Sequence, residues 1–558
     1  MKKLLTILAA LIISASNVAQ AQDCLWAKSA GGTASESGNG TCTDASGNIY
    51  VTGSFTSPTI TFGTITLTNS TQFGLSDIYI VKYSTDGTVL WAKSEGGSNN
   101  DNAKSICTDT NGNFYIAGNF SSDTLTFGTI SLVNSFISFN SPNVFIVKYD
   151  PNGNVLWAKS AGGTEVDQCN SITADVSGNV YITGYFESDT ITFGASSFTN
   201  ANFIGFPSDV FIAKYSTDGD VIWAKAAGST SFDMGQSVST DASGNVYVTG
   251  YYGDSITFGT NVLTNSGVSD VFLVKYNPDG TELWAKSLVG AGADNCYCAS
   301  TDLNGNVFIT GTFNGSMLSF GSITLNSSGN NNIFLAKIDS DGIVLWAKSA
   351  GNQDYLRSYS ISTDPEGNIY LSGNLPIGIT TFDTTTLTNP NETEYDIFII
   401  KFSSLGTILW ANSSGGNRSD GASGVCTDLN GNVYLTGSFS SPTITFGTTT
   451  LTNPNNSLFN SDIYIVKYSG VSTGTSESSA NNQLIISPNP TNSSITLSMP
   501  SLKNSKVSIT TLTGTEVGNY NTENTSTQTI DISHLASGVY FVSLKSEEGV
   551  LTKKIIKQ

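Results

Sequence analysis

Acidic side chains are the chemically capable residues that recur most regularly in this 558-residue sequence. Seven of them each follow a segment of the type W-A-K-S-x-G-G and come shortly before an Asp-x-x-Gly-Asn turn: Glu36, Asp101, Asp167, Asp233, Asp294, Asp354 and Asp420, here called the ring acids. A circle of carboxylates could hold Ca²⁺ or accept hydrogen bonds from sugar hydroxyls. The alternative is that each ring acid caps a loop within its own repeat, which regular recurrence favours.

Other catalytic chemistry has few candidates. The sequence contains one histidine, His534, which lies near the C-terminus, and two arginines, Arg357 and Arg418. Serine–histidine and cysteine–histidine catalysis therefore have no basis in the repeats, and we predict no catalytic residue and no firm metal site. A pair of carboxylates acting on a glycosidic bond stays open as an alternative.

The ring acids belong to a repeat of about 60 residues. Seven tryptophans recur at spacings of 61 to 66 residues: Trp26, Trp91, Trp157, Trp223, Trp284, Trp346 and Trp410. Each unit contains four short runs rich in β-branched and aromatic residues, separated by Asp/Asn-Gly turns, which predicts a four-stranded antiparallel meander. The third run, as in I-Y-I-V (Ile78–Val81), is apolar throughout and requires burial on both faces, as in a β-propeller.

The two ends of the repeat array are incomplete in complementary ways. Cys24–Gly32 is a lone fourth strand, and the last unit ends at its third strand, Asp462–Tyr468. We therefore predict an all-β fold with seven blades, in which the N-terminal strand pairs with the last unit and closes the ring. The predicted ring-closing residues are Leu25, Trp26, Ala27, Asp462, Tyr464 and Val466.

Three further sets of residues carry predictions. Lysines end the third strands and follow the tryptophans, where we expect them to keep their ammonium groups in water or to block strand edges. Three of the seven cysteines (Cys42, Cys107 and Cys426) occupy one slot of the repeat, which indicates packing. The long loops contain phenylalanines that form a candidate contact patch: Phe136, Phe139, Phe203 and Phe206.

The N-terminus indicates secretion. Residues 1–21 combine two lysines, an apolar run and Ala19-Gln20-Ala21, as in a signal peptide cleaved between Ala21 and Gln22. No later run is apolar enough to span a bilayer. The formal net charge is −20, which argues against nucleic acid as a partner.

Two resemblances follow from these motifs. The pattern T-D-x-x-G-N-x-Y-x-T-G followed by D-x-F-x-x-K-Y-x-x-x-G-x-x-x-W resembles the seven-bladed β-propeller repeats of secreted bacterial proteins. The end of the chain resembles the type A C-terminal sorting domain of the type IX secretion system of Bacteroidetes. The residues that carry this second resemblance are Pro488, Asn489, Pro490, Gly538, Tyr540, Lys553 and Lys554. It implies export by that machinery, removal of the domain, and attachment of the body to the cell surface or its release.

The expected organisation is a signal peptide (1–21), a propeller (22–468), a flexible linker (469–483) and a small Ig-like β-sandwich (484–558) that engages the secretion machinery. The favoured function is that of a monomeric, non-enzymatic binding or adhesion protein without a required cofactor, touching a glycan or a protein through its long-loop face. The alternatives are a Ca²⁺-dependent hydrolase or lyase of extracellular polysaccharide and a structural component of a surface coat.

Overall fold

The computed structural model describes the residue ranges 23–71, 74–134, 141–201, 207–327, 331–351, 356–391, 394–454, 460–470, 485–487, 491–498, 506–511, 516–522, 527–546 and 549–557. These residues divide into two compact units, Met1–Thr473 and Gly474–Gln558. Every regular element among them is a β-strand, as predicted from the turn-rich, β-branched sequence. None of the described residues forms a helix long and apolar enough to cross a membrane.

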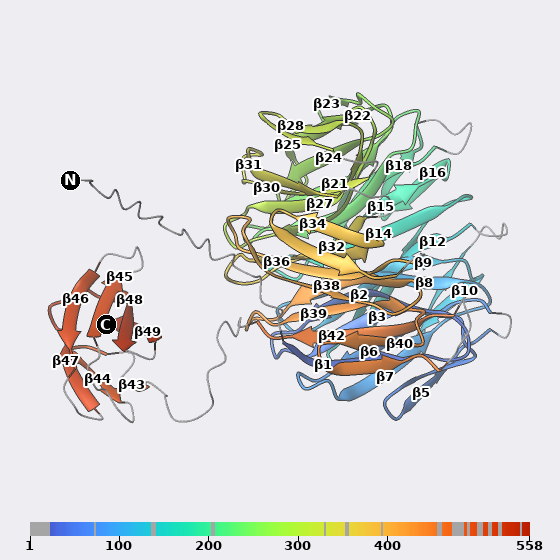
Figure 1. Cartoon of the computed structure of the whole chain (residues 1–558). Coiled ribbons are helices and arrows are strands. Elements are labelled where there is room, and N and C mark those ends of the chain that lie inside the picture. The colour runs from blue at the N-terminus through green and yellow to red at the C-terminus, as the bar shows by residue number, and fades with distance from the viewer. Residues whose placement is uncertain are drawn as a thin grey trace, which may run out of the picture. The chain divides into compact units, whose positions relative to one another are not determined.

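The first unit consists of seven four-stranded antiparallel meanders, numbered here sheets 1 to 7 in chain order (Figure 1). The first strands are β2 (Glu36–Thr43), β8 (Asp101–Thr108), β14 (Asp167–Ala174), β20 (Met234–Thr240), β26 (Ala293–Thr301), β32 (Arg357–Thr363) and β38 (Asp420–Thr427). The second strands are β3 (Ile49–Phe55), β9 (Phe114–Phe120), β15 (Val180–Phe186), β21 (Val246–Tyr252), β27 (Val307–Asn314), β33 (Ile369–Leu375) and β39 (Val433–Phe439).

The third and fourth strands form the outer half of each sheet. The third strands are β6 (Asp77–Tyr83), β12 (Asn143–Tyr149), β18 (Asp209–Tyr215), β24 (Asp270–Tyr276), β30 (Asn332–Ile338), β36 (Asp396–Phe402) and β42 (Asp462–Tyr468). The fourth strands are β7 (Val89–Glu95), β13 (Val155–Ala161), β19 (Val221–Ala227), β25 (Glu282–Gly290), β31 (Val344–Ala350), β37 (Ile408–Ser414) and β1 (Cys24–Ala30). All seven residues of every third strand are buried, which explains their continuous apolar sequence.

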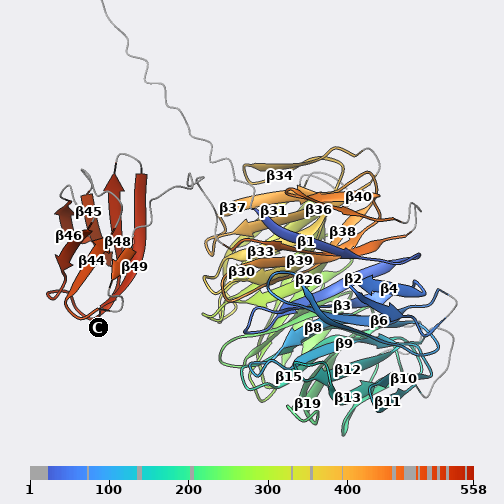
Figure 2. The ribbon, with the colours of Figure 1, turned by 90° about the horizontal axis from the view of Figure 1, so that it is seen from below.

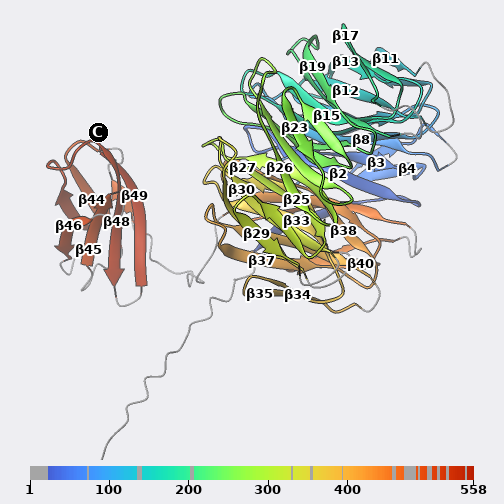
Figure 3. The same ribbon diagram turned by 90° about the horizontal axis from the view of Figure 1, so that it is seen from above.

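The connection between the second and third strands forms an additional hairpin in every sheet. These hairpins are β4 (Thr59–Phe62) with β5 (Ile65–Thr68), β10 (Thr124–Phe127) with β11 (Ile130–Val133), β16 (Thr190–Phe193) with β17 (Ser196–Thr199), β22 (Ser255–Phe258) with β23 (Asn261–Thr264), β28 (Met317–Phe320) with β29 (Ile323–Asn326), β34 (Gly378–Phe382) with β35 (Thr385–Asn389), and β40 (Thr443–Phe446) with β41 (Thr449–Thr452). They contact the fourth strands and lie at the periphery of the unit (Figures 1 and 3). Their alternating side chains bury one apolar face, as in Ile60, Phe62 and Leu67.

The seven sheets form a closed circle. Each first strand contacts the first strands of the sheets before and after it, and β38 of sheet 7 contacts β2 of sheet 1. Figure 3 shows β2, β8, β26 and β38 inside the outer elements β11, β17, β35 and β40. The apolar clusters lie between neighbouring sheets: one of them combines Tyr115 of sheet 2 with Phe186 and Phe211 of sheet 3. This is the arrangement of a β-propeller, in which stacking of sheets buries both faces of each one.

The last sheet is assembled from both ends of the array. Strand β1 pairs antiparallel with β42, with Ala27 opposite Val466 and Ser29 opposite Tyr464. In Figure 2 the blue strand β1 lies among the orange strands of the seventh repeat. Ala27 and Val466 enter the apolar cluster of sheets 6 and 7, while Leu25 is largely exposed. The Trp26 indole Nε1–H donates to the Thr85 carbonyl of sheet 1 at 3.2 Å.

A girdle of threonines joins the sheets where the first strands end. The hydroxyl of the last residue of each first strand donates to the backbone carbonyl of the corresponding residue in the preceding sheet. Six such bonds of 2.7–3.1 Å are present: Thr43 to Thr427, Thr108 to Thr43, Thr240 to Ala174, Thr301 to Thr240, Thr363 to Thr301, and Thr427 to Thr363. Sheet 3 has Ala174 at this position and makes no such bond. The bond from Thr43 to Thr427 spans the ring closure.

The second unit contains two sheets. The first contains β43 (Ile485–Ser487), β44 (Ser494–Ser498) and β47 (Thr527–Asp531); the second contains β45 (Lys506–Thr511), β46 (Glu516–Asn521), β48 (Gly538–Ser546) and β49 (Gly549–Lys557). One apolar cluster takes residues from both, including Leu497 and Ile530 from the first and Val507, Val542 and Ile555 from the second. Two sheets around a shared core are the sandwich arrangement.

The ring closure leads to a stability prediction. Replacing Ala27 by Asp places a charge in the buried cluster beside Val466, and we expect it to lower the free energy of unfolding by about 3 kcal/mol. The control is Ser29→Asp, which adds the same charge at an exposed position of the same strand. Differential scanning calorimetry should show a markedly lower Tm for Ala27→Asp alone; equal Tm values for the two variants would contradict the role of β1 as a packed strand.

The girdle leads to a second prediction. Ala174→Thr supplies the missing hydroxyl, which can donate to the Thr108 carbonyl, and we expect it to stabilise the protein by about 1 kcal/mol. Ala174→Ser tests the hydroxyl without the methyl group, and Ala174→Val adds equal bulk without a donor. Urea unfolding should rank Thr above Val; a Val variant as stable as the Thr variant would show that packing, not the hydrogen bond, matters at this position.

Candidate functional site: the mouth of the axial channel

The ring acids, predicted to form a rim for ligands or cations, are instead fully buried. Glu36, Asp101, Asp167, Asp233, Asp294 and Asp420 have no solvent exposure, and Asp354 lies outside the described residues. The rim prediction is therefore wrong for these six, because a group without solvent contact cannot meet a ligand. Among the residues that the structure describes, no group of three or more His, Cys, Asp or Glu side chains is arranged to hold a metal ion.

Hydrogen bonds show what the ring acids do. The Asp101 carboxylate accepts bonds from Gly97 N–H at 2.9 Å and from the Ser122 hydroxyl at 2.7 Å. The Asp101 N–H donates to the Ser76 carbonyl of the preceding sheet at 2.8 Å. The same pattern recurs at Asp167 and Asp420. These ring acids thus tie the connection between two sheets to a loop of the second sheet, so the predicted capping of a loop also holds the junction between repeats.

The paired glycines of the W-A-K-S-x-G-G segment make this junction possible. A Cβ atom on Gly96 would lie 2.1 Å from Asp77 Oδ1, and one on Gly97 would lie 2.5 Å from the Ser122 side chain. Asp77 begins the third strand of sheet 1, so its carboxyl group faces the same junction as Asp101. Asp209 with Asp233, Asp270 with Asp294, Asp396 with Asp420 and Asp462 with Glu36 repeat this proximity of two acids.

Burial changes the ionisation of these groups. Desolvation raises the pKa of Glu36, Asp101, Asp167, Asp233 and Asp294 to about 7 and that of Asp420 to about 6. It also raises the pKa of Asp396 to about 7 and that of Asp462 to about 6. Asp233 Oδ2 and Asp209 Oδ1 are buried without a hydrogen-bond partner. Such oxygens favour the protonated carboxyl group.

The lysines of the third strands are also buried, contrary to the prediction that their ammonium groups reach water. Lys82 is 7% exposed, and its Nζ lies 3.4 Å from Asp44 Oδ2 and 4.7 Å from the centre of the Tyr50 ring. It also donates to the Pro151 carbonyl of the next sheet at 3.2 Å. All seven third-strand lysines lie over an aromatic ring in this way. They are part of the structural core between the sheets.

A different set of residues faces the axis of the circle. Each first strand contains a β-bulge, and the bulged residue is one without a pairing partner: Asn39, Lys104, Asn170, Gln236, Tyr297, Tyr359 and Ser423. A bulge redirects a side chain away from the sheet face, and all seven of these residues line one cavity of about 530 Å³. We call this cavity the channel mouth. Among its other lining residues, Tyr395 and Ser461 directly precede the third strands β36 and β42, and Asn374 and Ser438 lie in the second strands β33 and β39.

The channel mouth has two chemically distinct sides. Tyrosines from sheets 5 and 6 form one side: the rings of Tyr297 and Tyr359 lie 6.0 Å apart between centres, and Tyr395 is 36% exposed beside them. Hydroxyl and amide groups form the other, from Ser419, Ser423, Ser438, Ser440, Ser461 and Asn39. Asn374 Oδ1, also on the wall, is buried without a hydrogen-bond partner. The mouth therefore offers aromatic faces and many hydrogen-bonding groups.

Two cations modify this surface. Lys104 keeps solvent contact in the channel, but desolvation by the surrounding wall lowers the pKa of its ammonium group. Arg357 begins β32 and hydrogen-bonds Tyr359, which raises the pKa of the guanidinium group; Tyr297 and Tyr395 lie close to the same group. The guanidinium group of Arg357 therefore stays charged at neutral pH.

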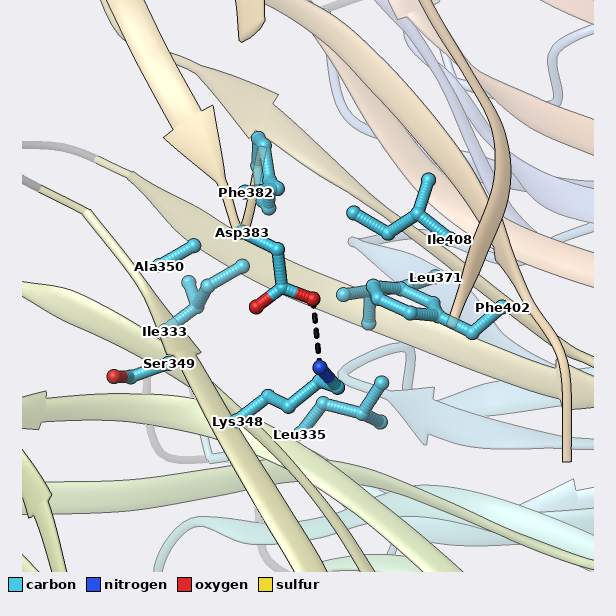
Figure 4. A pocket seen from close by; sticks show the side chains of 10 residues that line it. All are labelled: Ile333, Leu335, Lys348, Ser349, Ala350, Leu371, Phe382, Asp383, Phe402 and Ile408. Atoms are coloured by element: carbon cyan, nitrogen blue, oxygen red, sulfur yellow. Dashed lines mark hydrogen bonds and ion pairs between the residues drawn. The ribbon is translucent and has the colours of Figure 1, made fainter. Parts of the chain in front are cut away.

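Two other cavities are less suited to ligands. One, of about 20 Å³, lies beside Lys348 and Asp383, whose Nζ and Oδ2 are 2.6 Å apart (Figure 4). It has room for about one water molecule. Asp383 has φ 51° where the other hairpins have Gly, so the Lys348 contact accompanies a strained backbone. The second, of about 340 Å³, lies between β1 and sheet 1 and is lined by side chains such as Lys28, Phe62 and Tyr83, which recur in the repeat.

The other predicted site residues are distributed as follows. Ala21, Gln22, Phe136, Phe139, Phe203, Phe206, Pro488, Asn489 and Pro490 lie outside the described residues. Gly538 begins β48, the Tyr540 hydroxyl donates to the Ala536 carbonyl at 2.9 Å, and Lys553 and Lys554 lie in β49. All seven cysteines carry free thiols. Cys296 and Cys298 flank the bulged Tyr297, which accounts for their close spacing.

Sequence reasoning missed the channel residues although a signal was present. Three positions after the described ring acids the repeats carry Asn, Lys, Asn, Gln, Tyr and Ser, whereas the positions directly before and after this one carry only Gly, Ala, Ser or Cys. A position that varies while the rest of the repeat is regular indicates a side chain without a repeated structural role. Recognising it required the register of the first strand, which the bulge shifts by one residue.

Comparison with known proteins finds a matching family for a part of each unit. A family model described as a β-propeller repeat matches residues 156–185, and one described as a secretion system C-terminal sorting domain matches residues 485–558. The chain contains a β-propeller repeat and a type IX sorting domain. The predicted resemblances are confirmed, and so is export by the type IX system to the cell surface or the extracellular space.

Two curated relatives were found for this β-propeller-repeat protein. An uncharacterized WD repeat-containing protein of Acanthamoeba polyphaga mimivirus is 27% identical over 76% of this chain and 36% of its own length. The regulatory protein FlaEY of Caulobacter vibrioides is 27% identical over 21% of this chain and 12% of its own. The chain thus spans about a third or less of the length of these relatives.

Solved structures also resemble the chain. Sqt1 of Chaetomium thermophilum has a TM-score of 0.37 and 8% identity, over 76% of this chain and 83% of its own. A protein of unknown function from Bacteroides thetaiotaomicron has a TM-score of 0.26 and 10% identity, over 75% of this chain and 94% of its own.

The buried acids lead to a pH prediction. Since their folded pKa values are raised to about 6–7, their stabilising contribution is complete below the unfolded pKa near 4 and is lost as the pH rises through 6–7. We therefore expect the propeller-repeat protein to have a higher Tm at pH 5 than at pH 8. Asp233→Asn removes one titrating group and should reduce this difference, while Asp218→Asn, at an exposed turn, should not. A Tm that rises from pH 5 to pH 8 would contradict the assignment.

Proposed function

We propose that the propeller is a non-enzymatic binding module that takes a carbohydrate at its channel mouth, displayed at the cell surface or released after export. The observation that carries this proposal is the convergence of the seven bulged residues, which differ between repeats, on one cavity. Residues with structural roles recur in every repeat, so a position that varies and points inward is the part of the array free to be adapted to a ligand.

The chemistry of the channel mouth suits a carbohydrate. Tyrosine rings are flat and apolar with a polar edge, so they can pack against the C–H face of a sugar while the hydroxyl groups stay solvated. Serine, asparagine and glutamine side chains donate and accept hydrogen bonds, which matches the dual character of sugar hydroxyls. A volume of about 530 Å³ lies within the range of small-ligand pockets. The Asn374 side chain, 8% exposed, lines the same wall.

The arrangement of hydrogen bonds adds to this fit. Asn39 Nδ2 donates to the Ala103 carbonyl at 2.8 Å, and Asn170 Nδ2 donates to the Gly235 carbonyl at 2.9 Å. The amide nitrogens are held by the neighbouring sheet, which fixes the side chains and leaves their oxygens to face the channel. Groups fixed before binding lose little entropy when a ligand arrives.

The test is a binding screen with a defined set of variants. The purified protein should bind one or more immobilised oligosaccharides on a glycan array, and isothermal titration should give the Kd of the strongest. We expect Tyr359→Ala to raise Kd by about 3- to 10-fold, from the loss of about 0.5–1.5 kcal/mol of ring packing. Tyr359→Phe should keep most of the affinity, and Asn374→Ala should weaken binding.

The matched control is Asn152→Ala, at an exposed turn on the opposite ends of the strands. It should leave Kd unchanged. A protein that binds no glycan, or that binds one equally well after Tyr359→Ala and Asn374→Ala, would contradict the proposal. Unchanged thermal unfolding of each variant establishes that any loss is local.

A further inference from the structure

The positive charges of the propeller fall into two groups, and one of them is not part of the repeat. Thirteen of its lysines occupy the two recurrent positions, at the end of the third strand and after the tryptophan. Three cations remain outside this pattern: Lys104, Arg357 and Arg418, the last two being the only arginines in the chain. Since no structural repeat requires them, their location is informative.

Lys104 lines the channel mouth, and the two arginines contact residues that line it. Lys104 lines the cavity from the bulge of β8. Arg357 hydrogen-bonds Tyr359, which lines the cavity from β32. Arg418, in the connection before β38, donates from Nη1 to the carbonyl of Ser440 at 3.3 Å, and Ser440 lines the cavity. The cations come from sheets 2, 6 and 7, so they reach the mouth from different directions around the axis.

We infer that the ligand of this site is an acidic saccharide, bearing carboxylate or sulfate groups that meet Lys104 and Arg357. The inference rests on the proposed function and names the class of sugar. None of the ion pairs between described residues includes Lys104 or Arg357. The Arg357 guanidinium group lies close to tyrosine side chains. Such a group can bind a planar carboxylate through two parallel hydrogen bonds.

The acidic groups near the mouth differ in charge and burial. Glu394 accepts a hydrogen bond from the hydroxyl of Ser419, a residue of the wall, and this bond leaves its negative charge in place. The ring acids lie buried behind the wall, and burial keeps their pKa values at about 6–7. Lys104 keeps solvent contact, but the surrounding wall partly desolvates its ammonium group and lowers its pKa, and an anionic partner stabilises the charged form.

The net charge of the whole chain restricts the length of the acidic ligand. A formal net charge of −20 repels long polyanions such as nucleic acids over most of the surface. A short acidic saccharide, or the end of a longer one, can place its charge inside the channel mouth and keep the remainder in solvent. The cations of the channel mouth then attract the short saccharide, while the negative charge of the remaining surface repels larger polyanions.

The experiment compares matched probes that differ in charge alone. Tetragalacturonate and its fully methyl-esterified form test the carboxylate, and a sulfated tetrasaccharide of the carrageenan type and its desulfated form test the sulfate. Isothermal titration with the full protein should give at least tenfold tighter binding for one acidic probe than for its neutral partner. Its affinity should fall with added NaCl, as expected for charge pairing.

Variants assign the effect to the named cations. Lys104→Met and Arg357→Gln should each weaken binding of the acidic probe about tenfold and lower the ratio of acidic to neutral affinity. Lys286→Met, which removes an exposed recurrent lysine outside the channel mouth, should change neither. If the neutral form of each pair binds as well as the acidic form, the inference is wrong while carbohydrate binding stands. If neither member of any pair nor any glycan of the array binds, the proposed function fails and this inference with it.

Discussion

The propeller depends on one backbone pairing, that of β1 with β42. The first six sheets each take four strands from one continuous stretch of chain, but sheet 7 lacks a fourth strand until the N-terminal segment arrives. An unpaired β42 would present a free edge, which is a template for aggregation. Because β42 is buried along its whole length, the interface of sheet 7 with sheet 1 also needs β1 in place. Closure therefore couples the first and last residues of the array in one cooperative structure.

Around that closure, repeated residues do similar work at the junctions between sheets. A ring acid, two glycines and a serine hold the connection before sheets 1, 2, 3 and 7, and a lysine over an aromatic ring holds the other end of the strands in every sheet. The threonine girdle adds a third contact near the axis. Since these contacts recur in most repeats, the sheets are related by similar geometry. The residues that differ between the repeats are the bulged side chains, which meet at the axis.

Much of the fold could be predicted because local signals carry it. The Trp spacing and the Asp-x-x-Gly-Asn turns indicate the units, and the apolar third strand indicates burial on both faces. The site could not be predicted in the same way. The polar sequence around Glu36 reads as a solvent-facing loop, yet the neighbouring Ser57 and Gly32 supply enough hydrogen bonds to bury the carboxyl group. Lys82 reads as an edge lysine, yet Asp44 and Tyr50 compensate its burial. In both cases a partner distant in sequence decides exposure.

Burial of the ring acids also bears on the electrostatics of the channel mouth. The formal charge counts every carboxyl group as ionised, but those between the sheets have pKa values of about 6–7, and their partners at the third strands are raised as well. Near neutral pH a part of the negative charge close to the axis is therefore absent. Lys104, which lines the channel mouth, and Arg357, which contacts Tyr359 of its wall, therefore meet less negative charge than the composition suggests. The same junctions that hold the sheets together thus allow a positive site to persist at the centre of an acidic protein.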